Sequence, residues 1–143
     1  MPVRLHTADG GTVEAEVFLH TVGESGRPET LGDRLNDPHL RFLPCRVAGR
    51  VELVHLERLA YVEALAPLPE LRDLEEVGAV RQPVEVDLAH GPALQGTLVY
   101  SRPAGSQRVS DLLNLGEERF LLLVVDAEKS LYVRRDELLR VRA

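Results

Sequence analysis

The sequence predicts an all-β protein built from two similar halves, and three observations lead to this fold class. Apolar and polar residues alternate with a period of two along most of the chain, as in strands with one buried face. Two segments of about sixty residues resemble each other when the chain is compared with itself. Turn signals separate five strand-like runs in each segment, so we expect two tandem five-stranded small barrels.

The repeat rests on matches with a nearly constant spacing. Asp-x-Leu-Asn occurs at 33–36 and 111–114, and Arg-Phe occurs at 41–42 and 119–120, both with an offset of 78 residues. The residues that match downstream at an offset of 79 are Val54 with Val133, Leu59 with Leu138 and Val62 with Val141. The only two asparagines of the chain therefore occupy one position of the repeat. Insertions fall between the predicted strands, as expected of a duplication.

These matches divide the chain into a first repeat at 1–64, a connector at 65–83 and a second repeat at 84–143. Two prolines open the connector, and Leu71 and Leu74 then fall on one face of a short amphipathic helix. A solvated face is favoured for its acidic residues, with a docking surface as the alternative. One repeat alone would bury only about 60% of its unfolded surface. We therefore expect the two halves to fold as one cooperative unit.

Each repeat is predicted to begin with a β-hairpin. The predicted strands are 3–7 and 13–19 in the first repeat, and 84–88 and 94–100 in the second. The turns between them are Asp9-Gly10 and His90-Gly91, because glycine there allows a tight hairpin connection. Gly96, inside the second strand of the second hairpin, predicts a bend or a bulge.

A loop rich in glycine, serine and proline follows each hairpin, at 23–29 and at 102–107. The Asp-x-Leu-Asn motif then predicts a single helical turn, because aspartate accepts backbone N–H groups at a helix start and asparagine suits its end. Three strands complete each repeat, with a tight charged corner before the last one. These strands are predicted at 40–47, 51–55 and 59–63, and at 119–126, 131–134 and 138–142.

This pattern resembles the small Sm-like and SH3-like barrels. The features that carry the resemblance are the turn glycines Gly10 and Gly91, Asn36 and Asn114 before an apolar strand, and the closing strand, corner and strand at 132–138. The Sm-like resemblance covers nearly all of both repeats, and it implies RNA binding by Asp111, Asn114 and Arg134. RNA-binding Sm-like proteins place Asp and Asn between strands two and three, whereas here these residues follow a long inserted loop. Asp-x-Leu-Asn also resembles an uncharacterised bacterial family, which implies no biochemical role.

Composition narrows the function classes. Seventeen Lys and Arg against 23 Asp and Glu give a net charge of −6, which disfavours nucleic-acid binding through phosphate neutralisation. The single cysteine, Cys45, cannot form an internal disulfide, and no long apolar run occurs. We therefore expect a cytoplasmic protein without a signal peptide or membrane span. The five histidines lack metal-ligand spacing and no cofactor or catalytic motif occurs, so we expect no metal, no cofactor and no enzyme activity.

Six polar residues are candidates for a binding site: Asp33, Asn36, Asp111, Asn114, Arg134 and Arg135. The repeated Asp and Asn have two interpretations. They form two equivalent binding sites, or they cap and end a helical turn, and the second interpretation is favoured. The two arginines belong to a locally basic end of the chain. A solvated strand face is favoured for them, and an anion or nucleic-acid patch is the alternative.

Six consecutive apolar residues predict a strand that is apolar on both faces. They are Phe120, Leu121, Leu122, Leu123, Val124 and Val125. A small barrel buries one face of a strand, so the connector helix, the first repeat or a second chain must cover the other. Packing within the chain is favoured over a homodimer. We predict a non-enzymatic protein-interaction or adaptor module, with an Sm-like RNA-binding protein and a hydrolase using Asp33 or Asp111 as alternatives.

Overall fold

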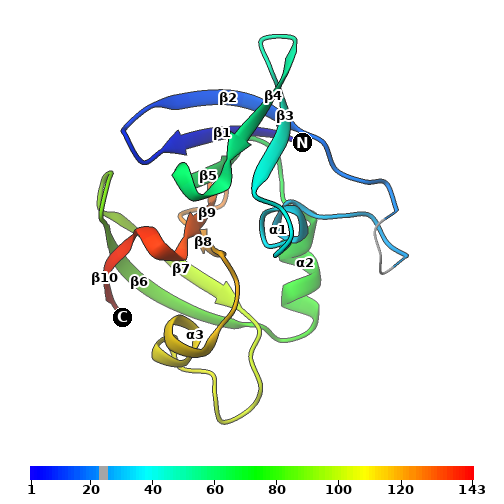
Figure 1. The fold of residues 1–143 in the computed structure, drawn as a ribbon. Coiled ribbons are helices and arrows are strands. Elements are labelled where there is room, and N and C mark those ends of the chain that lie inside the picture. Colours follow the sequence, from blue (N-terminus) through cyan, green and yellow to red (C-terminus); the bar gives the residue numbers. More distant parts are fainter. Residues whose placement is uncertain (23–25) are drawn as a thin grey trace.

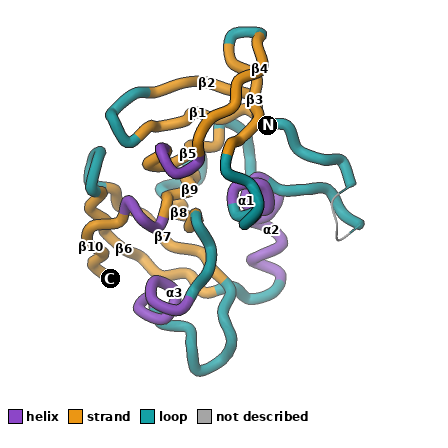
Figure 2. Tube along the Cα trace, in the orientation of Figure 1, coloured by secondary structure: helices purple, strands orange, loops and turns teal. Residues whose placement is uncertain are grey.

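The computed structural model describes residues 1–22 and 26–143, and antiparallel strands dominate it (Figure 1). Ten strands form one sheet in the order β10-β6-β7-β8-β9-β5-β1-β2-β3-β4. The described residues contain only three short α-helices and two 3₁₀ turns besides the strands (Figure 2). The predicted all-β class is therefore confirmed. Residues 23–25 of the loop predicted at 23–29 lie outside the described residues.

The first half of the sheet is a meander whose last strand returns to the first. Its strands are β1 (Pro2–Thr7), β2 (Thr12–Val17), β3 (Phe42–Val47), β4 (Arg50–His55) and β5 (Leu59–Ala64). Helix α1 (Leu31–Leu35) lies between β2 and β3, and the 3₁₀ turn η1 (Leu56–Arg58) forms the corner before β5. β5 pairs with β1, so the strand order within this half is β5-β1-β2-β3-β4.

The second half has the same strand order, β10-β6-β7-β8-β9. Its elements are β6 (Val80–Leu88), β7 (Leu94–Tyr100), α3 (Val109–Leu115), β8 (Phe120–Val124), β9 (Ser130–Arg134), η2 (Arg135–Glu137) and β10 (Leu138–Arg142). Helix α2 (Pro69–Glu76) precedes it, with a proline in its first turn, where a missing N–H costs no hydrogen bond. β6 starts four residues before the predicted strand, because Val80 already pairs with Tyr100.

One open sheet replaces the two separately closed barrels that the sequence predicts. β5 pairs with β1 on one side and with β9 on the other, where Tyr61, Val62 and Glu63 lie opposite Val133, Tyr132 and Leu131. Backbone pairing therefore continues from one half into the other. The sheet ends at β4 and at β10, which each have one neighbouring strand.

Of the bend or bulge predicted at Gly96, no bulge occurs, and the glycine serves a close approach between two strands. The pairing of β6 with β7 runs through Val84 and Gly96 without a register shift. A Cβ atom at Gly96 would lie only 2.6 Å from the carbonyl oxygen of Val124 in β8. Any side chain at this position would therefore push β7 away from β8.

Strand β8 is buried on both faces, from Phe120 to Leu123. Leu121 and Leu123 belong to the apolar core of the second half. Phe120 and Leu122 belong to the core of the first half, together with the two leucines of α1. Val124 and Val125 are half-buried beside these cores. The first half and the connector thus cover the outer face of β8 within the same chain.

Candidate interaction site

Asn36 connects the two halves, because its side-chain amide binds Phe120 as the backbone of a neighbouring strand would. Its Nδ2 donates to the carbonyl oxygen of Phe120 at 3.1 Å, and its Oδ1 accepts the N–H of Phe120 at 2.7 Å. The Arg135 N–H donates to the Arg119 carbonyl, so the next pair along the ladder, Phe120 with Arg134, is a non-hydrogen-bonded pair. The backbone groups of Phe120 therefore point away from β9 and toward Asn36.

Arg119 makes a second polar connection between the halves. Its guanidinium donates to the carbonyl oxygens of Leu40, at 2.7 Å, and Asp37, at 3.1 Å. Both carbonyls lie in the segment between α1 and β3. Beside these bonds, Leu31 and Leu35 of α1 pack in the same apolar core as Phe120. One short helix with its following loop therefore holds the start of β8 through apolar and polar contacts.

Asn114 has no such role within the chain. Its Nδ2 donates to the Ser110 carbonyl of its own helix at 2.9 Å, and its side chain is exposed. The two aspartates of the motif, by contrast, act alike. The Asp33 carboxylate accepts the Thr30 N–H at 3.0 Å, and the Asp111 carboxylate accepts the Arg108 N–H at 3.1 Å. Both aspartates cap the start of a helix, whereas the two asparagines differ in what they bind.

The guanidinium groups of Arg134 and Arg135 donate hydrogen bonds to oxygen atoms of the same chain. Arg134 is buried, donates from Nε to the Leu59 carbonyl at 2.7 Å, and pairs with Glu137 at 2.9 Å. Arg135 donates to the carbonyl oxygens of Leu112 and Leu113 in the last turn of a helix, where the Leu112 carbonyl also accepts the Gly116 N–H. The first arginine connects β9 to β5, and the second stabilises the C-terminal end of α3.

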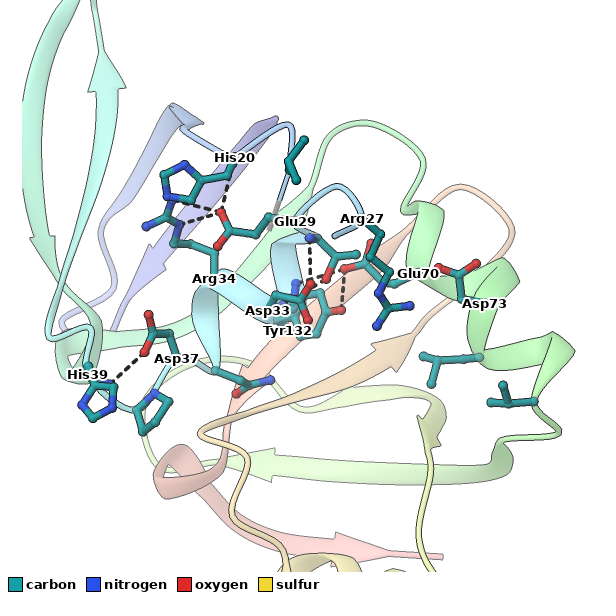
Figure 3. A pocket seen from close by; sticks show the side chains of 17 residues that line it. His20, Arg27, Glu29, Asp33, Arg34, Asp37, His39, Glu70, Asp73 and Tyr132 are labelled. Carbon is teal, nitrogen blue, oxygen red and sulfur yellow. Dashed lines mark hydrogen bonds and ion pairs between the residues drawn. The ribbon is translucent and has the colours of Figure 1, made fainter. Parts of the chain in front are cut away.

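An open cavity of about 1130 Å³ lies beside α1 and α2 (Figure 3). At its wall, the buried Glu70 of α2 accepts the Tyr132 hydroxyl at 2.8 Å and the Gly32 N–H at 3.0 Å. Burial raises the pKa of Tyr132 well above its ordinary value, which keeps the hydroxyl protonated as a donor. A Cβ at Gly32 would lie 2.5 Å from the Tyr132 hydroxyl oxygen, so any side chain there would displace the Tyr132 ring. Asp33 also lines this cavity.

The Glu70–Tyr132 contact escaped the sequence analysis. The two residues are 62 positions apart, and Glu70 looks like an ordinary acidic residue in the first turn of a helix. The contact connects α1, α2 and β9, so the connector is attached to both halves. Among the described residues, Glu70 Oε1 is the one buried side-chain oxygen or nitrogen without a hydrogen-bond partner.

The open edge at β4 carries exposed apolar side chains. Phe42, Val51 and Leu53 are 49%, 65% and 65% exposed. Pro44 lies opposite Leu53, and Arg46 lies opposite Val51, so these side chains share the outer face of the β3–β4 hairpin. Figure 1 shows this hairpin projecting at the top of the molecule. An unpaired apolar edge of this kind is a template for a further strand.

The opposite end of the sheet also exposes apolar side chains. Leu139 in β10 is 70% exposed, and Leu115 at the end of α3 is 62% exposed. β10 borders β6 at the left of Figure 1 and has no neighbour on its other side. The molecule therefore has two open edges, each accompanied by apolar surface. The sequence predicts β4 and β10 as strands, but no local pattern marks them as the two edges of the sheet.

Known proteins offer no guide to this site. No protein-family model matches the sequence, and no curated protein or solved structure is significantly similar to it. Over residues 1–22 and 26–143, no group of three or more His, Cys, Asp or Glu side chains is arranged to hold a metal ion. The longest helix in this part of the chain, α2, has eight residues, too few to span a lipid bilayer.

Proposed function

We propose that this chain is a non-enzymatic protein-interaction module, and that it binds a partner by adding a strand to β4. The observation that carries the proposal is the open β4 edge beside exposed Phe42, Val51 and Leu53. In strand addition, backbone hydrogen bonds supply affinity, and alternate side chains supply specificity. The β4 edge offers both an unpaired strand backbone and exposed alternate side chains.

The chemistry of the edge defines the partner segment. Val51 and Leu53 project to the outer face with Phe42, while Glu52 between them projects to the other side. An extended segment that pairs with β4 would cover the apolar side chains with apolar residues of its own. A cationic residue opposite Glu52 would add a favourable cross-strand pair.

The identical strand order of the two halves supports a duplication of one small-barrel unit. In this proposal, the second unit uses its fourth strand, β9, inside the chain. The first unit offers its fourth strand, β4, to a partner. The internal use of Arg134 and Arg135, together with the net charge of −6, favours a protein partner over RNA.

A peptide selection tests this function. A phage-displayed library of random peptides is selected on the wild-type chain, and the selected peptides are measured on Leu53→Lys and on Val77→Lys. Val77 is 72% exposed just after α2, so its variant makes the same change away from β4. We expect peptides with alternating apolar residues that bind wild type and Val77→Lys and perturb β4 amide signals in NMR spectra. Equal binding to Leu53→Lys, or no selected peptide, would contradict the proposal.

A further inference from the structure

We infer that the partner of β4 is the β10 strand of a second copy of this chain, so that chains associate head to tail. This inference rests on the proposed function and names its partner. The reason is that the internal junction of the molecule already contains the required contact. Three features of this junction have counterparts at the open ends: the strand pair, the asparagine contact and the apolar side chains that cover the strand.

The first counterpart is the strand pair itself. At the junction, β5, the fifth strand of the first half, pairs with β9, the fourth strand of the second. The open edges are β4, the fourth strand of the first half, and β10, the fifth strand of the second. Joining β10 of one chain to β4 of the next repeats the internal pairing and occupies both edges.

The offset of 79 residues also predicts the register of this pairing. The internal pair Val62–Tyr132 becomes Val141–Leu53. The internal pair Glu63–Leu131 becomes Arg142–Glu52, which brings opposite charges face to face. Within one chain Arg142 pairs with Asp87 at 2.8 Å and with Glu85 at 3.3 Å, and in this register Glu52 of the second copy would join the same cluster. Charge complementarity thus supports a second copy as the occupant.

The second counterpart is the asparagine contact. Phe42 and Asn114 correspond to Phe120 and Asn36. The Leu56 N–H donates to the Arg41 carbonyl, so the next pair, Phe42 with His55, is a non-hydrogen-bonded pair. The backbone groups of Phe42 therefore point away from β4, as those of Phe120 point away from β9. The exposed amide of Asn114 from a second chain can bind them as Asn36 binds Phe120.

The third counterpart is the apolar cover. Leu31 and Leu35 of α1 pack in one core with Phe120. The matching residues of α3 are Val109 and Leu113, which are half-buried, and Phe42 is half-exposed. Docking α3 of one chain over the β3–β4 hairpin of the next would bury these apolar surfaces together. Ala60, buried in the internal junction, corresponds to the exposed Leu139, which the same docking would cover.

Association of this kind is heterologous, because the β4 end and the β10 end are different surfaces. Copies that join in this way form a ring if the rotation closes and a filament if it does not. A two-fold symmetric dimer would leave one edge of each chain open. Head-to-tail association therefore occupies both open edges, which a two-fold symmetric dimer does not.

Two variants with complementary defects test the inference. Leu53→Lys disables the β4 end, and Leu139→Lys combined with Asn114→Ala disables the β10 end. All three side chains are exposed in the single chain, so both variants should fold, which circular dichroism and thermal melting verify. Val77→Lys serves as the control and should assemble like wild type.

Light scattering gives the outcomes. We expect wild type to exceed the 15.9 kDa mass of one chain, and each variant alone to remain at that mass. An equimolar mixture should reach twice that mass and stop there, because each chain keeps one working end. A wild type of 15.9 kDa at every concentration, or a mixture that stays at that mass, overturns the inference. So does a β10-end variant that dimerises alone, which would indicate symmetric β4–β4 pairing.

A milder pair of substitutions keeps the test valid if Leu53→Lys fails to fold. Glu52→Arg opposes the positive charge of Arg142, and Glu75→Arg makes the same charge change on exposed α2. Glu52→Arg should weaken association about tenfold, while Glu75→Arg should leave it unchanged. Equal effects would overturn the predicted register. A monomeric wild type that still binds selected peptides at β4 overturns only the inference, whereas loss of both kinds of binding also overturns the proposed function.

Discussion

β9 and β4 hold the same place in the strand order of their halves, yet one is buried and the other is exposed. In β9, Leu131, Tyr132 and Val133 are all buried, because β8 and β5 flank the strand. In β4, Val51 and Leu53 are about two-thirds exposed, because only β3 flanks it. The number of flanking strands, rather than the position within the half, therefore decides how far β9 and β4 are buried. The exposed apolar side chains of β4 are the reason for proposing an additional neighbouring strand there.

The largest expected effect compares the aromatic residues at the start of β8 and of β3. Phe120→Ala removes a fully buried ring and should lower the free energy of unfolding by about 3–5 kcal/mol. Phe42→Ala removes a half-exposed ring and should cost less than about 1 kcal/mol in the single chain. Urea unfolding in the Leu53→Lys background measures both without self-association. Equal losses would show that β3 and β8 do not differ in the way described.

The next effect compares the two asparagines. Asn36→Ala leaves the buried Phe120 N–H and carbonyl without partners, which should cost about 1–3 kcal/mol. Asn114→Ala removes one bond to its own exposed helix and should change stability by less than about 0.5 kcal/mol. Thermal and urea unfolding test this difference. In the association assay the order of the two effects should reverse. Asn114→Ala should weaken assembly, because Asn114 lies at the open β10 end, and Asn36→Ala should not.

Local patterns explain why much of the fold could be predicted from the sequence. The alternation of polar and apolar residues locates most strands, and the burial on both faces predicted from the run Phe120–Val125 holds from Phe120 to Leu123. The helix caps at Asp33 and Asp111 are equally local, because each carboxylate binds a backbone N–H only three residues away.

The remaining features depend on contacts between distant parts of the chain. Asn36 meets Phe120 across 84 positions, and no pattern around Asn36 distinguishes it from Asn114. The junction of β5 with β9 is equally non-local, which is why the sequence predicted two closed barrels instead of one open sheet. One local pattern does point to the central position of β5. The run Leu59-Ala60-Tyr61-Val62 is apolar at every position, as is typical of a strand with two neighbours and two buried faces.

The smallest expected effect concerns pH and the inner strand of the junction. The His6 ring stacks on Tyr61 of β5 with ring centroids 4.1 Å apart, and burial holds the pKa of His6 below its ordinary value of 6.5. The unfolded chain therefore binds more protons than the folded chain as the pH falls from about 6.5, so the free energy of unfolding should decrease there. The contact of His6 with Glu63 opposes this effect and keeps it small. Urea unfolding across this range should show the decrease in wild type and not in His6→Gln.

Hydrogen exchange followed over a dilution series tests the central claim, that one kind of junction operates both within and between chains. The amides of β5 and β9 should stay protected at every protein concentration, because their pairing is internal. The amides of β4 and β10 that face the open edges should be protected at high concentration and lose protection together on dilution. Edge amides of β4 and β10 that exchange rapidly at every concentration would contradict the account.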